Sequence, residues 1–280
     1  MSEFPRTKVE DLSLPRMLIG TNWFLGWSHK TAAKDKFIRE DVTEQKVAEI
    51  IEVFMNAGID AIMGFAHNQK MMNSIRRAED KAGKKLIIIS TPALNLAGTP
   101  EAEAENAKLF DEEAEQGVSI CMPHQSSTDV LCDRLERKIR RMDKYAAMIR
   151  QRGMIPGLST HMPEAPVYAD ETQLDVGTYI QIYNAIGFLM QIEIEWVQRV
   201  IQGLKKPVMA IKPMAAGRLT PLVGLSYAWA TLRDIDMVTV GTMTPDEAKE
   251  VIEVSLAQLE RRQAEVELQR TRSKKSIDGK

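Results

Sequence analysis

Long apolar runs and cysteine are both scarce in this chain of 280 residues. No stretch approaches the roughly 18 apolar residues that a membrane-spanning helix needs, so we expect no membrane partner. The two cysteines, Cys121 and Cys132, provide no disulfide framework, and Cys121 lies in an apolar run where we expect it to fill the core. The polar N-terminal sequence has no apolar signal segment, and we therefore expect a cytoplasmic location.

The chain also lacks an excess of charge of either sign. Its 37 Lys and Arg residues face 39 Asp and Glu residues, which gives a formal net charge of −2. A nearly balanced charge offers no electrostatic attraction to nucleic acid, so we expect none as a partner. We expect a small-molecule substrate instead, and we leave a homo-oligomer open.

What the chain does contain is an alternation of eight short apolar runs with amphipathic stretches. Continuous apolar runs are typical of parallel strands that are buried on both faces, and the stretches between them have helical spacing. We therefore predict an α/β fold, a single (β/α)8 TIM barrel over residues 1–260, with a charged and frayed tail over 261–280. The apolar runs are Met17–Thr21, Ala61–Phe65, Leu86–Thr91, Val118–Met122, Met154–Thr160, Thr178–Tyr183, Val208–Pro213 and Met237–Gly241.

Between these runs, four segments carry specific expectations. The first run is followed by a long loop that carries Trp23 and Trp27, aromatic residues that are candidates for a pocket wall. One continuous helix is predicted over Val130–Arg152, and another over Phe188–Leu204. The segment Met162–Asp175 holds two prolines, and we predict a long loop there that is a candidate lid.

All four histidines lie beyond the end of an apolar run. In a parallel barrel the segments after the strands build the mouth, where the chemistry takes place. We predict that His67, His124 and His161 form a catalytic cluster, and that the same three imidazoles are candidate ligands for a divalent transition metal. The alternative is three unrelated polar loop residues. His29 is expected to be exposed to solvent.

Several other polar residues follow the predicted strands. Lys212 ends the seventh run, where it could contact an anion, play a structural role or form a Schiff base; anion contact is the preferred interpretation. Gly241 and Thr242 precede the last helix, whose amino end can hold a phosphate. The remaining candidates are Gln181 and Asn184 for hydrogen bonds to a ligand, and Asp129, Glu164 and Asp170 as a base or an extra ligand, with caps and plain polar contacts as the alternative.

Four groups of residues together resemble the aldo-keto reductase superfamily. The resemblance implies a TIM barrel with NAD(P) at its mouth, the amide of the nicotinamide held by Gln181, and Ser159 among the cofactor-binding residues. The groups are Ile19-Gly20-Thr21 with Trp23 and Gly26, then Gly157–His161, then Gln181–Asn184, and finally Lys212–Leu219 with Tyr227–Ala230 and Val240–Glu247.

The catalytic residues of that superfamily carry over poorly. Of its tetrad of Asp, Tyr, Lys and His, only the last is matched, by His124. Met63 stands where the Asp is expected, His67 or Asn68 where the Tyr is expected, and Ser90-Thr91-Pro92 where the Lys is expected. Without the Tyr and the Lys, hydride transfer would leave an alkoxide with no acid to protonate it.

We therefore predict a divergent member of this superfamily, an enzyme with non-redox chemistry of the isomerase, lyase or hydrolase type. Its substrate would be a small polar carbonyl or polyhydroxy compound, with assistance from the metal held by the histidines. One alternative is an NAD(P)-dependent oxidoreductase with a rearranged acid, such as His67 in place of the tyrosine. The other alternative is a non-catalytic descendant that binds a ligand.

Overall fold

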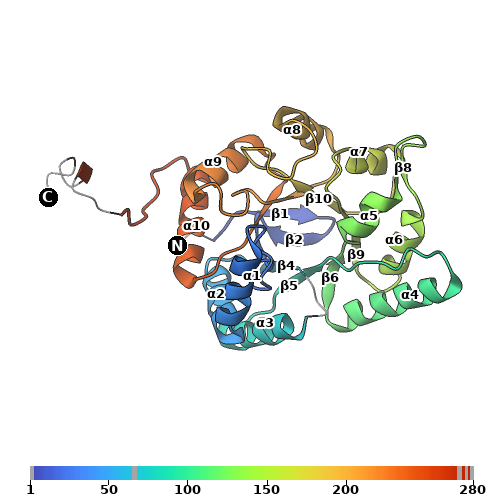
Figure 1. Cartoon of the computed structure of the whole chain (residues 1–280), viewed down its shortest axis with the longest axis horizontal. Helices are drawn as coiled ribbons and strands as arrows, with labels where there is room; N and C mark the ends of the chain where they lie inside the picture. The colour runs from blue at the N-terminus through green and yellow to red at the C-terminus, as the bar shows by residue number, and fades with distance from the viewer. Residues whose placement is uncertain (1–2, 65–67, 270–272, 275–276, 278–280) are drawn as a thin grey trace.

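Eight parallel strands close into a barrel, which confirms the predicted fold class (Figure 1). The computed structural model describes residues 3–64, 68–269, 273–274 and 277. Around the barrel the strands follow the order β10-β11-β12-β3-β4-β5-β6-β9. Their bounds are β3 Met17–Gly20, β4 Ala61–Gly64, β5 Ile87–Ser90, β6 Val118–Cys121, β9 Ile155–Ser159, β10 Thr178–Ile182, β11 Val208–Ile211 and β12 Met237–Val240.

Helices cover the outside of the strands (Figure 1). Several begin at a threonine whose side chain accepts a backbone N–H of the first turn, as Thr43, Thr99 and Thr244 do. The bounds are α1 Ala32–Asp41, α2 Glu44–Asn56, α3 Gln69–Ala82, α4 Pro100–Glu115, α5 Gln125–Leu131, α6 Met142–Arg150, α7 Glu164–Glu171, α8 Ile194–Gly203, α9 Pro221–Thr231 and α10 Pro245–Leu259. Among the described residues, none of the helices is long and apolar enough to cross a bilayer.

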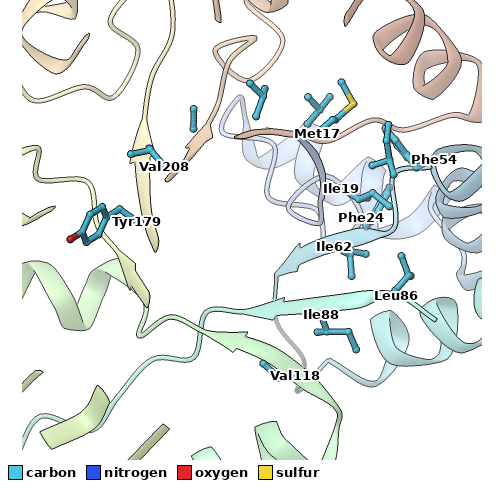
Figure 2. Packing of buried hydrophobic residues seen from close by; sticks show 14 of the residues in the cluster. Met17, Ile19, Phe24, Phe54, Ile62, Leu86, Ile88, Val118, Tyr179 and Val208 are labelled. Carbon is cyan, nitrogen blue, oxygen red and sulfur yellow. The ribbon is translucent and has the colours of Figure 1, made fainter. Parts of the chain in front are cut away.

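Two apolar layers hold the barrel together. Figure 2 shows part of the larger layer, in which strand residues such as Ile19 and Ile62 share a cluster with Phe54 of α2. A second cluster fills the barrel interior with residues such as Leu18, Ile120 and Met209. Both faces of the strands are therefore buried, which is why the sequence shows continuous apolar runs instead of alternating ones.

A hairpin closes one end of the barrel. Strands β1 (Arg6–Val9) and β2 (Leu12–Pro15) pair antiparallel just before the barrel begins at β3. Val9 and Leu14 are fully buried and belong to the interior cluster, so the hairpin plugs the amino-terminal end of the strands. In the described part of the chain, the carboxyl-terminal end is the one left open to a ligand. Nothing in the apolar pattern of the sequence predicted this hairpin.

The prediction of one helix over Val130–Arg152 was wrong. The segment is divided into α5, a short hairpin of β7 (Cys132–Asp133) and β8 (Lys138–Ile139), and α6. The Asp133 carboxylate accepts the backbone N–H groups of Leu135 and Glu136 at 2.9 and 3.1 Å, which stabilises a turn in place of a helix.

The predicted lid loop over Met162–Asp175 was also wrong, because α7 occupies its centre. Pro166 lies in the first turn of that helix, where its missing N–H breaks no intrahelical hydrogen bond. Two further boundaries differ from the predictions. Helix α1 forms within the long loop after β3, and α8 begins at Ile194, six residues after the predicted start.

Candidate active site

A cavity of about 870 Å³ opens among the segments that follow the barrel strands. This volume lies within the range of small-molecule sites. Six of the predicted site residues line it: His124, His161, Lys212, Ser159, Gly241 and Thr242. His67 lies outside the described residues, so the three-histidine cluster is only partly visible.

Lys212 follows β11 in an uncommon backbone conformation. Its φ is +61°, and Ala215 and Ala216 after it also have positive φ, so three non-glycine residues of one loop lie in the left-handed region. Among the described residues nothing hydrogen-bonds or ion-pairs with its ammonium group. Burial lowers the pKa of Lys212 to about 8. Strained loops and perturbed lysines are both concentrated at functional sites.

His161 follows β9, and its pKa is affected by the charge of the same lysine. Burial is the main cause that lowers its pKa to about 4, followed by the charge of Lys212 and then by His124 and His29. The backbone N–H of His161 lies 3.3 Å from both carboxylate oxygens of Asp129, and the Thr160 hydroxyl also donates to Asp129. Asp129, a predicted candidate base, therefore positions the loop that carries His161.

His124 caps helix α5. Its Nδ1 accepts the backbone N–H of Ser126 at 3.3 Å and lies 2.9 Å from the Ser126 hydroxyl. Burial and then Lys212 lower the pKa of His124, which favours a neutral ring. A neutral imidazole that accepts at Nδ1 carries its proton on Nε2. His29 is exposed, as expected, but it also lines the cavity, where burial and Lys212 lower its pKa.

The predicted metal site stays a prediction, since one of its three ligands, His67, is not described. No group of three or more His, Cys, Asp or Glu side chains within the described ranges is arranged to hold a metal ion. The charge of Lys212 lowers the proton affinity of His124 and His161, and by the same repulsion it opposes a divalent cation at these rings.

The side chains of Gln181 and Asn184, which were predicted to bind a ligand, do not line the cavity. Gln181 is buried, and its Nε2 donates to the carbonyl oxygen of Met162 at 3.2 Å. Asn184 is fully buried and organises the following loop through hydrogen bonds with Phe188. Neither is among the lining residues, so the predicted contact of Gln181 with a nicotinamide gains no support from its position.

The amino end of α10, the predicted phosphate site, carries a carboxylate of the protein itself. Glu247 Oε2 accepts the backbone N–H of Met243 at 2.6 Å, and both Glu247 and Glu250 line the cavity. A phosphate group at this helix end would meet two negative charges, which counts against the phosphate groups of NAD(P) at this position of the cavity. Within the described residues, the buried hydroxyls of Thr21 and Thr242, which line the cavity, have no hydrogen-bond partner and are available to a polar group of a ligand.

Two loops meet over the cavity. Lys30 Nζ, after β3, donates to the carbonyl oxygen of Gly217 at 3.2 Å, and Arg218, after β11, donates to the carbonyl oxygen of His29 at 3.1 Å. Trp23 and Trp27 line the cavity from the first of these loops, in agreement with their predicted place in its wall. Lys30 and Arg218 could not be predicted from the sequence, because an isolated basic loop residue gives no signal by itself.

Comparisons with known proteins support the fold of the chain but do not show its activity. No protein-family profile and no curated protein matches the chain. Solved structures do match. A candidate aldo-keto reductase from Pseudomonas aeruginosa shares 14% identity at a TM-score of 0.66, over 92% of this chain and 99% of its own.

Two further structures give the same result. An aldo/keto reductase from Brucella melitensis has 13% identity and a TM-score of 0.58, over 91% of this chain and 93% of its own. The aldose reductase of Giardia lamblia has 14% identity and a TM-score of 0.55, over 96% of this chain and 90% of its own. The chain therefore has the barrel fold of aldo-keto reductases, which confirms the resemblance at the level of the fold.

Proposed function

We propose that the protein is an enzyme that acts on a small anionic carbonyl compound by proton transfer, without a redox step. One observation carries the proposal: a lysine that has no acidic partner among the described residues and two histidines with lowered pKa values line one cavity at the mouth of the barrel. Titratable groups with perturbed pKa values in a cleft are the usual mark of an active site.

Each of the three residues has a distinct role. The Lys212 ammonium group holds a negative oxygen of the substrate, since no carboxylate within the described part of the chain neutralises it. His161 is neutral at pH 7 and can take a proton from the carbon next to the carbonyl group. His124 presents a proton on Nε2 and can donate it in a hydrogen bond to the carbonyl oxygen.

Binding of small acids tests this proposal before the substrate is known. Pyruvate, glyoxylate and oxalate should raise the melting temperature of the protein, because a ligand of the folded state stabilises it by mass action. The shift should be lost in Lys212→Met and kept in Lys205→Met, which changes an exposed lysine before β11, at the other end of the strand. Equal shifts in the two variants would contradict the role of Lys212, and unchanged turnover of an identified substrate in His124→Ala would overturn the proposal.

An NAD(P)-dependent oxidoreductase is the second candidate. The fold comparisons favour it at least as well as they favour the non-redox enzyme. Ser159, Gly241 and Thr242 line the cavity, as that alternative expects. The carboxylates at the amino end of α10 count against it. Thermal unfolding in the presence of increasing NADH or NADPH distinguishes the two candidates. Saturable stabilisation by either nucleotide favours the oxidoreductase, and the absence of stabilisation favours the non-redox enzyme.

A further inference from the structure

We infer that Lys212 is a nucleophile whose amine forms an imine with the carbonyl carbon of a 2-oxo acid or a small aldehyde acid. The inference deepens the proposed function and rests on it for the class of substrate. In this inference Lys212 forms a covalent bond to the substrate, whereas the proposed function requires only its positive charge. Three independent features of the site support it: position, isolation and surroundings.

The position of Lys212 in the fold places its amine where a ligand can reach it. Lys212 is the first residue after β11, on the wall of the cavity at the open end of the barrel. The hairpin β1–β2 closes the other end, so a ligand enters on the side where Lys212 lies. The positive φ of Lys212 belongs to a turn closed by the hydrogen bond from the N–H of Ala215 to the carbonyl of Lys212, at 2.8 Å, so local backbone contacts fix the origin of its side chain.

Isolation leaves the amine free to react. Most partly buried lysines pair with a carboxylate, and that pair keeps them protonated. Within the described residues, Lys212 has no such partner. Glu247 and Glu250 line the same cavity, but Glu247 is engaged with the N–H of Met243, and only burial contributes to the lowered pKa of Lys212.

The surroundings favour the neutral amine. Burial is the cause that lowers the pKa of Lys212, and the wall of the cavity that it lines includes apolar side chains such as Ile180, Ile211 and Met214. With a pKa of about 8, about a quarter of the Lys212 side chains are neutral at pH 7.5. For an ordinary exposed lysine the fraction is about one in a thousand. The neutral amine is the form that attacks a carbonyl group.

The step is balanced without a further reactant. The nitrogen lone pair of Lys212 forms a bond to the carbonyl carbon while the carbon–oxygen π bond breaks, and one of the two protons of the amine passes to that oxygen to give a carbinolamine. His161, as the neutral base, removes the second proton from the nitrogen and returns it to the hydroxyl group, which leaves as water while the nitrogen lone pair forms the C=N bond. The products are the imine and one water molecule. On the rim of the cavity, Lys30 and Lys34 supply positive charge for the acidic group of the substrate.

Reductive trapping tests the inference. The protein is incubated with glyoxylate or pyruvate, reduced with borohydride, digested and mapped by mass spectrometry. We expect the modification on Lys212 to form at least tenfold faster at pH 7.5 than on exposed lysines, with a midpoint near pH 8. Lys212→Arg should abolish it, because a guanidinium group keeps the charge but forms no imine, while Lys205→Met should leave it unchanged.

The outcomes separate this inference from the proposed function. Saturable binding of pyruvate in the wild type and in Lys212→Arg, with no trapping on Lys212, overturns the imine and leaves the charge contact standing. Trapping on Lys212 without saturable binding supports a reactive amine and overturns the proposed substrate class. Modification of Lys212 at the rate of exposed lysines, or with a midpoint above pH 10, also overturns the inference.

Discussion

Lys212 holds a positive charge at a place where the folded protein gains no stability from it. Its pKa falls from the ordinary lysine value of 10.4 to about 8, so the folded state binds the proton less tightly than the unfolded chain does. The resulting loss of stability is fully present below pH 8 and is relieved as the pH rises from 8 to about 10.4. Residues kept for function often carry such a cost.

Replacement of this lysine should therefore stabilise the protein. We expect Lys212→Met to raise the free energy of unfolding at pH 7 by about 1–2 kcal/mol, a value reduced for solvent screening from about 1.4 kcal/mol for each pKa unit. Denaturant unfolding at pH 7 and pH 10 measures it, and the gain should shrink at the higher pH. A variant that is less stable than the wild type at pH 7 would contradict this account; Lys205→Met serves as the control.

A glycine fixes the wall of the same cavity. A Cβ atom on Gly64 would lie 2.8 Å from Cβ of Thr21, and closer still to its hydroxyl oxygen. We expect Gly64→Ala to destabilise the protein by about 1–3 kcal/mol through overpacking. Adding Thr21→Ala should recover part of the loss, because the displaced groups are then absent.

Thermal unfolding of the two single variants and the double variant gives the coupling between these sites. Gly203→Ala is the matched control, because a Cβ atom there meets nothing within 4 Å and the residue lies in α8. It should be neutral or slightly stabilising. If Gly64→Ala is equally harmless, Thr21 and Gly64 do not approach each other closely at the ends of β3 and β4.

Single residues show why the sequence predicted part of the site. His124, His161 and Lys212 could be predicted to line one mouth because each lies at or just beyond the end of an apolar run, and barrel closure brings such positions together. Gln181 lies near the end of the run Thr178–Tyr183, but its amide binds the loop after β9. A sequence does not reveal whether a polar group at a strand end is already satisfied by the backbone.

At the scale of elements, strands were more predictable than connections. Continuous apolar runs identified all eight barrel strands, because burial on both faces leaves a strong signal. The segment 130–152 was mistaken for one helix because its apolar spacing continues through the turn at Asp133. That turn depends on side-chain hydrogen bonds to the backbone, which hydrophobic periodicity does not record.

The amino end of α10 offers a test at this scale. Glu247 places a negative charge where the helix dipole would otherwise attract an anion. We expect Glu247→Gln to raise the affinity of the cavity for inorganic pyrophosphate about five- to tenfold, since about 1 kcal/mol of repulsion is removed. Isothermal titration at low ionic strength measures the change.

Asp246→Asn removes an equal charge from the same turn and is the control. Its carboxylate is exposed and is not part of the cavity lining, so its effect on pyrophosphate should be much smaller. Equal effects of the two substitutions would mean that only net charge matters. No effect of either would mean that the amino end of α10 does not face bound anions.

At the scale of the whole molecule, closure of the barrel brings the titratable side chains after the strands together at one mouth. The β1–β2 hairpin closes the opposite end of the barrel. Convergence has an electrostatic consequence: burial and Lys212 lower the pKa values of His29, His124 and His161 together. The folded state then binds fewer protons than the unfolded chain between about pH 4 and pH 6.5. Stability must therefore fall as the pH falls through this window.

Substitution of His161 isolates the largest part of this pH dependence. We expect His161→Gln to reduce the loss of unfolding free energy between pH 7 and pH 4.5 by about 1–2 kcal/mol, because glutamine binds no proton in either state. Denaturant titrations at several pH values give the two slopes. The carboxylates with lowered pKa values, such as Asp111 and Asp133, lose stability at lower pH and do so equally in both proteins, so the difference between the curves belongs to the histidine. Parallel curves from pH 7 to pH 4.5 would show that the imidazole of His161 is solvated like that of the unfolded chain and does not share a desolvated cavity with Lys212.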